Sequence, residues 1–157
     1  MVLCLMGCGP QEDPPASEAP VAGLETQLLG TWETIEIEVT APTYGGEDTT
    51  IVDHIREADW GQVYGVRPAR TVFTPDGKLR RTHRLKTGQV ANITNGLWRA
   101  QGSDSLILIE PNVTYLYAYT IEGERLELEG TVDYDLDGEA DDDYRAVLRL
   151  VSRTGEN

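Results

Sequence analysis

An acidic loop late in the chain holds the side chains best suited to chemistry. Carboxylates at positions 1, 3 and 5 of a loop, a glycine at position 6 and a backbone carbonyl at position 7 let a chain wrap around calcium. So many carboxylates in one short loop would also repel one another without a counter-ion. The sequence therefore predicts a structural calcium site whose ligands are Asp133, Asp135, Asp137, Asp141 and, through its carbonyl, Glu139, with Gly138 at the turn.

This loop resembles the D-x-D-x-D-G-x-x-D calcium loops that join two strands in β-proteins. It differs from a helix-flanked EF-hand because Tyr144 stands at position 12, where a bidentate glutamate belongs. Without that ligand we expect weak affinity, about 10⁻⁵ to 10⁻³ M, and a structural role rather than a sensing one. The alternative is a solvated acidic turn without an ion.

Residues for catalysis are few. The chain has two histidines, His54 and His83, and its two cysteines, Cys4 and Cys8, both lie at the start. No nucleophile elbow, zinc-protease helix or phosphate-binding glycine loop occurs in the sequence. We therefore expect no enzyme. The remaining alternative is a carboxylate-based hydrolase, in which His54 would converge with carboxylates in a cleft; His83 is expected to face solvent.

Aromatic residues mark a candidate ligand site. Tyr115, Tyr117 and Tyr119 alternate along one segment and so share one face of a strand. Trp60 lies in an irregular insert beside Gly61 and could line the mouth of a cavity. These residues predict a site for a small apolar ligand, provided that the interior holds a cavity of about 300 Å³ or more. A filled interior would instead indicate a scaffolding or protein-interaction domain of the cell envelope.

The elements that position these residues repeat with a period of two. Strict alternation at 125–129 and a short apolar run at 105–110 are typical of strands, and turn sequences recur between such segments. Regular short spacing of strands and turns favours an antiparallel barrel over alternating strand and helix units. We predict an all-β, up-and-down β-barrel of about 8 to 10 strands, with at most one short helix, near 53–59.

Several motifs within 28–152 resemble the lipocalin-like domains of bacterial lipoproteins: G-x-W at 30–32, F-x-x-D-G-x at 73–78 and a second G-x-W at 96–98. The resemblance implies a lipocalin-like barrel in which Trp32 plugs one end. It also implies a cation-π contact between Trp32 and an arginine of a late strand, here Arg149 or Arg145. By their size and apolar character, Trp32 and Trp98 are expected in the core.

The start of the chain resembles the lipobox of bacterial lipoproteins. Leu5-Met6-Gly7-Cys8 follows apolar residues and precedes an acidic, proline-rich stretch. The resemblance implies a signal remnant and lipobox over 1–8, lipidation of Cys8, a disordered tether over 9–26 and a folded barrel over 27–153. It also implies a lipid-anchored protein of the bacterial envelope, on the outer membrane if the cell has one.

Charge excludes one class of partner. The formal net charge is -14, so a nucleic-acid ligand is not expected. Basic residues concentrate in 67–86 and acidic residues in 122–143. We interpret these stretches as two solvated hairpins of opposite sign that neighbour one another, the alternative being that the basic hairpin contacts an anionic partner such as lipid headgroups. The protein is expected to be a monomer.

Overall fold

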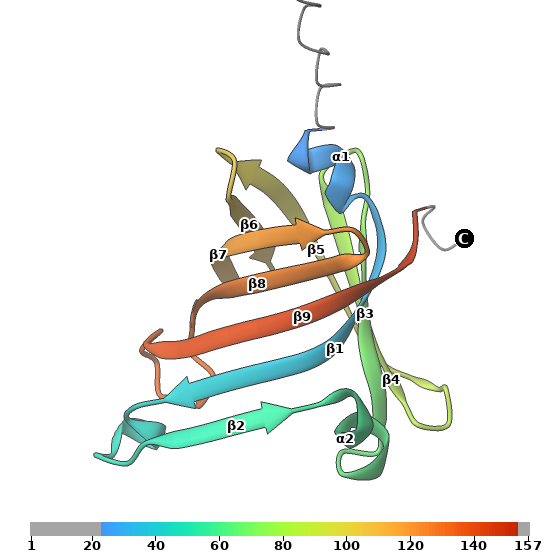
Figure 1. Cartoon of the computed structure of the whole chain (residues 1–157). Coiled ribbons are helices and arrows are strands. Elements are labelled where there is room, and N and C mark those ends of the chain that lie inside the picture. Colours follow the sequence, from blue (N-terminus) through green and yellow to red (C-terminus); the bar gives the residue numbers. More distant parts are fainter. Residues whose placement is uncertain (1–22, 154–157) are drawn as a thin grey trace, which may run out of the picture.

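Strands make up most of the computed structural model, which describes residues 23–153. Figure 1 shows them wrapped around a common interior, with short helices at the two ends. In chain order the elements are α1 (Leu24–Leu28), β1 (Gly30–Ala41), the 3-10 helix η1 (Tyr44–Gly46), β2 (Ile51–Ile55), α2 (Glu57–Gln62), β3 (Val66–Phe73), β4 (Lys78–Leu85), β5 (Val90–Gln101), β6 (Ser105–Glu110), β7 (Val113–Glu122), β8 (Arg125–Val132) and β9 (Asp142–Ser152).

The sheet closes on itself. From β3 to β9 each strand pairs antiparallel with the next, and β1 pairs with both β3 and β9, which gives a closed barrel of eight strands. The ninth strand, β2, pairs only with β1. The predicted all-β, antiparallel barrel is therefore confirmed.

The described residues contain two short α-helices, one more than expected. Helical character was predicted at 53–59, but Asp53 belongs to β2 and the helix there, α2, begins at Glu57. The other helix, α1, was not predicted. It begins at Leu24, so the described domain starts slightly ahead of the predicted boundary at Gln27.

Strand β1 changes its partner along one edge. Its first residues, Gly30 to Glu33, pair with β3, whereas Ile37 to Ala41 pair with β2. The chain must therefore cross from β2 to β3 where they separate, and α2 makes this connection. In Figure 1, α2 lies at the end of the barrel opposite α1.

The end of the barrel next to α1 is closed by apolar side chains. Trp32 is fully buried and its indole N–H donates to the carbonyl of Leu28 in α1 at 2.7 Å. The rings of Phe73 and Trp98 meet edge to face, with centroids 5.8 Å apart. Trp32 and Trp98 thus lie in the core, as the sequence predicts.

The two G-x-W glycines are explained by the close approach of neighbouring strands. A β-carbon on Gly30 would lie 2.2 Å from the carbonyl oxygen of Ser152, and one on Gly96 would lie 2.3 Å from that of Ile109. Real β-carbons never come so near to backbone atoms. Gly30 also has a positive φ of 121°, which glycine adopts at little cost.

The arginine over Trp32 is not the one expected. Arg153 lies above the indole, with its guanidinium carbon 5.6 Å from the ring centroid. Arg149 and Arg145 point outward from β9 and pair with glutamates instead. The reason is strand alternation: Ala146 and Leu148 face the interior, so the side chains of Arg145 and Arg149 point to the outer face.

Candidate functional site

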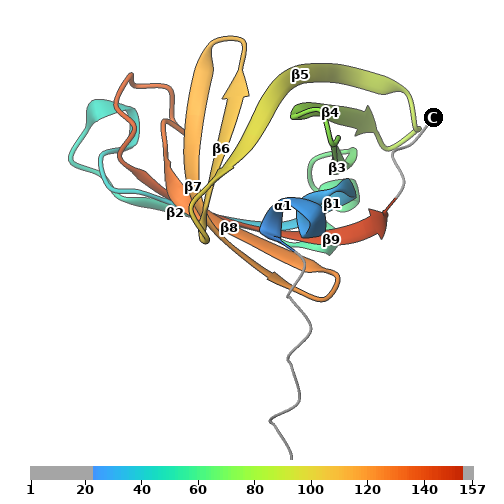
Figure 2. The same cartoon turned by 90° about the horizontal axis from the view of Figure 1, so that it is seen from above.

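A cavity of about 260 Å³ occupies the interior of the barrel. This volume falls just short of the roughly 300 Å³ at which ordinary small-molecule sites begin. Figure 2 shows the barrel from above, with α1 over the closed end and the strands surrounding the interior. Side chains from β1, α2, β3, β4, β6, β7, β8, the β8–β9 loop and β9 line the cavity, among them Trp60, Ala69, Thr71, Arg81, His83, Leu108, Tyr115, Tyr117, Asp133, Tyr134, Tyr144 and Ala146.

Strand β4 contributes an arginine and a histidine to one wall of the cavity. Leu79, Arg81 and His83 alternate along β4; Leu79 is buried in the core, and the other two line the cavity. Arg81 Nη1 lies 2.6 Å from Glu110 Oε1, and both side chains are largely shielded from solvent. This pair leaves little net charge at the wall.

His83 was expected to point to solvent; it is instead half-buried and lines the cavity. Burial lowers the pKa of its imidazole, and the nearby Arg81 cation lowers it further. We therefore expect a neutral imidazole in the wall at pH 7, able to donate at one nitrogen and accept at the other.

Tyrosine rings form another wall. Tyr115 and Tyr117 stack with centroids 5.7 Å apart, and Tyr144 meets Tyr117 at 5.8 Å. Burial raises the pKa of Tyr117 and, to about 12, that of Tyr144, so both are neutral phenols at pH 7. Of the three predicted tyrosines, Tyr115 and Tyr117 line the cavity, whereas Tyr119 is buried in the core beyond it.

Trp60, which the sequence suggested for the mouth of a cavity, belongs to α2 at the end of the barrel opposite α1, and we take this end as the mouth. It projects from α2, lines the cavity and donates its indole N–H to the carbonyl of Ile35 at 3.1 Å. Across the mouth, the hydroxyl of Tyr134 donates to Asp53 Oδ2 at 2.7 Å. This bond joins the β8–β9 loop to β2.

The acidic loop connects β8 to β9, as predicted for a loop between two strands. Gly138 N–H donates to Asp133 Oδ2 at 3.2 Å, and Asp137 N–H donates to Asp135 Oδ1 at 3.1 Å. Gly138 has a positive φ of 98°, consistent with its predicted place at the turn, and Leu136 also has a positive φ, of 63°. These bonds fold the loop back over its own carboxylates.

The carboxylates that meet are not all those predicted. Oxygens of Asp133, Asp135 and Asp142 lie within 4.8 Å of one another. Asp142 is buried and accepts from the backbone of Tyr134 at 2.6 Å. Asp141, the predicted ligand, instead accepts from the hydroxyl of Thr43 at 3.1 Å.

Of the other two predicted ligands, Asp137 stands outside this group of carboxylates, and Glu139 was predicted to bind through its backbone carbonyl rather than its side chain. Asp137 Oδ1 accepts from the backbone of Glu139 at 2.8 Å, and the Glu139 side chain is exposed. Within the described chain, Asp133 Oδ1 is buried and has no hydrogen-bond donor. The loop therefore holds one unpaired carboxylate oxygen beside two further carboxylates.

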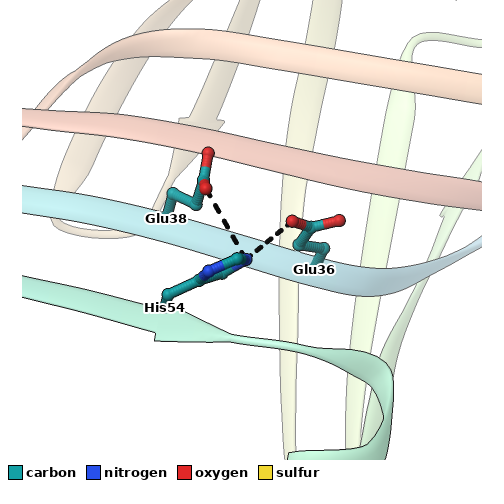
Figure 3. A group of neighbouring side chains, drawn as sticks. All are labelled: Glu36, Glu38 and His54. Atoms are coloured by element: carbon teal, nitrogen blue, oxygen red, sulfur yellow. Dashed lines mark hydrogen bonds and ion pairs between the residues drawn. The ribbon is translucent and has the colours of Figure 1, made fainter.

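A second group of ligand-type side chains lies on the outer face of the barrel. His54 Nε2 is 2.7 Å from Glu36 Oε1 and 3.6 Å from Glu38 Oε1, as Figure 3 shows. His54 thus converges with carboxylates, as the hydrolase alternative required. None of the three lines the interior cavity, and of the three only Glu38 borders a hollow on the outer face, which Thr40, Glu129 and Arg145 also line.

Two comparisons with known proteins found no match. No protein-family model matches the sequence, and no curated protein matches it.

Among residues 23–153, no helix has the length and apolar character needed to span a bilayer. The predicted lipidation residue, Cys8, lies outside the described residues, as does the predicted tether up to residue 22.

Proposed function

We propose that this protein is a non-enzymatic, lipid-anchored envelope protein whose barrel binds one small molecule in its interior. The observation that carries the proposal is the cavity of about 260 Å³ inside a closed barrel, lined by aromatic rings and a few polar groups. Concave, largely apolar sites with a few well-placed polar groups are the usual form of small-molecule sites.

The lining favours an uncharged ligand with an aromatic or other apolar body. Tyr115, Tyr117 and Trp60 offer ring faces, and the neutral His83 offers hydrogen bonding. An anion would gain little from Arg81, which is paired with Glu110, and would also meet Asp133, which lines the same cavity. The small volume restricts the ligand to roughly one or two rings, by the scale of ordinary ligand cavities.

A fluorescent probe tests this proposal directly. We expect the uncharged two-ring probe 6-propionyl-2-(dimethylamino)naphthalene, whose fluorescence depends on its surroundings, to gain fluorescence on titration with the protein. Ala69→Leu adds bulk at a buried lining residue and should abolish the gain, whereas Ala118→Leu, on the exposed face of β7, should leave it unchanged. Thermal melts of both variants establish that each folds.

Two results would count against an interior binding site. Equal fluorescence in both variants would place the probe on the surface, and no gain in the wild type would favour the alternative, a closed scaffolding domain. Such a domain would use its outer faces for interaction with other envelope proteins.

The acidic loop supports a second proposal, a structural calcium ion at the mouth of the barrel. The proposed ligands are the carboxylates of Asp133, Asp135 and Asp142. Their oxygens converge, and one of these oxygens, Asp133 Oδ1, is buried without a hydrogen-bond partner. Oxygen-only donors suit a hard cation such as calcium. The ion would tie the β8–β9 loop to the start of β9.

A further inference from the structure

A β-bulge in β1 sets the outer face on which Glu36, Glu38 and His54 meet. The register between β1 and β9 shifts between Thr34 and Glu36, so Ile35 is the extra residue. Thr34 and Ile37 both line the cavity, although they are an odd number of residues apart. The bulge therefore turns Glu36 and Glu38 outward, where regular alternation from Thr34 would bury Glu36.

Strand pairing then brings His54 to the two glutamates. Glu38 and His54 are direct partners in the antiparallel ladder of β1 and β2, so their side chains stand on the same face. Glu36 is two residues further back on that face. The three side chains are about one-third exposed, at 30% for Glu36, 43% for Glu38 and 28% for His54, so a hydrated ion can reach them.

We propose that Glu36, Glu38 and His54 form a binding site for a divalent cation of the zinc class. Imidazole nitrogen and carboxylate oxygen are both zinc ligands, and three protein ligands leave a fourth tetrahedral position open for water. Tetrahedral zinc with bonds of about 2.0 to 2.2 Å separates its ligand atoms by roughly 3.3 Å. The present separations from Nε2, 2.7 Å and 3.6 Å, lie on either side of that value.

The surroundings support the same site. Arg145 Nη1 donates to Glu38 Oε2 at 3.0 Å, which leaves Oε1 facing His54. A hydrogen bond on the second carboxylate oxygen orients a metal ligand, as such outer partners commonly do. The formal charge of -14 raises the local concentration of cations around the protein. The nitrogen ligand disfavours calcium and magnesium, which prefer oxygen.

Zinc alone is the probe for the test. The full chain should carry Cys4→Ser and Cys8→Ser, because thiolates would otherwise bind the metal. In competition with a chromophoric chelator we expect about one zinc per chain, with affinity reduced at least about tenfold by His54→Ala and by Glu36→Gln. Glu129→Gln removes a charge from the same outer face and is the matched control; it should bind zinc like the parent.

Proton NMR supplies a second measurement that does not depend on variants. The two histidines give separate imidazole signals, and zinc should shift those of His54 while leaving His83 in place. Three results would overturn the site: a shift at His83 instead, equal affinity in His54→Ala, or no zinc binding at about 100 µM. This result is independent of whether the cavity binds the fluorescent probe.

Discussion

Trp32 is the largest fully buried side chain among the described residues. It fills the closed end of the barrel and also donates a hydrogen bond to Leu28. Trp32→Ala should lower the free energy of unfolding by about 3 to 5 kcal/mol, because a large cavity remains where the indole was. Chemical denaturation measures this, with Val52→Ala as the control: Val52 is 71% exposed, so its replacement should cost less than about 0.5 kcal/mol. If Trp32→Ala lowered the free energy of unfolding by less than about 1 kcal/mol, Trp32 would not fill the closed end of the barrel as described.

His83 should make stability depend on pH in the weakly acidic range. Its pKa in the folded state lies below the ordinary value near 6.5, because of burial and then Arg81. The unfolded state therefore binds more protons in this range, and the contribution of His83 to stability falls as pH decreases through the unfolded pKa. We expect His83→Gln to lose less stability than the wild type between about pH 7.5 and about pH 5.5. Urea denaturation at both pH values measures this difference, and parallel losses would contradict it.

Strand alternation allows the sequence to predict which of these side chains face the interior of the barrel and which cannot. Leu79 is apolar and two residues before Arg81, so a period of two already places Arg81 and His83 on the interior face of β4. By the same rule Arg149, next to the inward-facing Leu148, must point to the outer face, so Arg149 cannot cover Trp32. Arg153 could not be predicted in this way, since it follows the end of β9 and its position depends on how the chain leaves the barrel.

At the scale of elements, the β8–β9 loop should respond to calcium. A bound ion would relieve the repulsion among Asp133, Asp135 and Asp142, so calcium should stabilise the folded state. At about 100 times the dissociation constant it should add about 2.7 kcal/mol and raise the melting temperature by several degrees. Melting curves in millimolar calcium and in chelator measure the effect.

Variants of the loop test whether calcium binds the ligands predicted from the sequence or the aspartates that the structure brings together. Asp142→Asn and Asp135→Asn should each abolish the response to calcium. Glu139→Gln should preserve the response to calcium, because the Glu139 side chain is exposed and does not belong to the group of three aspartates. The sequence predicted only the backbone carbonyl of Glu139 as a ligand, and this substitution keeps the carbonyl. Superimposable curves for the wild type would remove the calcium site.

The bulge in β1 shows how far sequence can predict an element. Trp32 and Thr34 occupy even positions, whereas Ile35, Ile37 and Val39 occupy odd ones, and this change of parity in the apolar residues indicates an extra residue. The pairing of His54 with Glu38 could not be predicted, because it requires the register between β1 and β2. That register depends on the length and course of the loop around η1. The zinc-type group therefore emerges only from the structure.

At the scale of the whole molecule, the basic and acidic hairpins do not adjoin. Strand β1 lies between β3 and β9, and its Glu33 pairs with Arg70 on one side and with Arg149 on the other, at 3.1 and 2.9 Å. The two arginines are partly open to solvent, whereas Glu33 is only 14% exposed, so these partly shielded pairs hold β1 in register with its neighbours. Sequence predicted the two charged stretches but not the strand between them, because closure of the barrel is a long-range property.

The last prediction concerns where the whole protein resides. If Cys8 carries lipid, the chain would reach the barrel from the side of α1, opposite the cavity mouth at α2, so that an anchored barrel would keep its mouth accessible. Expressed from the complete gene with its upstream sequence, the wild type should partition into the membrane fraction and incorporate labelled fatty acid. Cys8→Ser should release the protein or leave it unprocessed, while Cys4→Ser, the matched control, should remain anchored, because the lipobox resemblance places the lipid on Cys8 alone. Equal partitioning of all three forms would show that the lipobox resemblance is misleading, without affecting the cavity or either metal site.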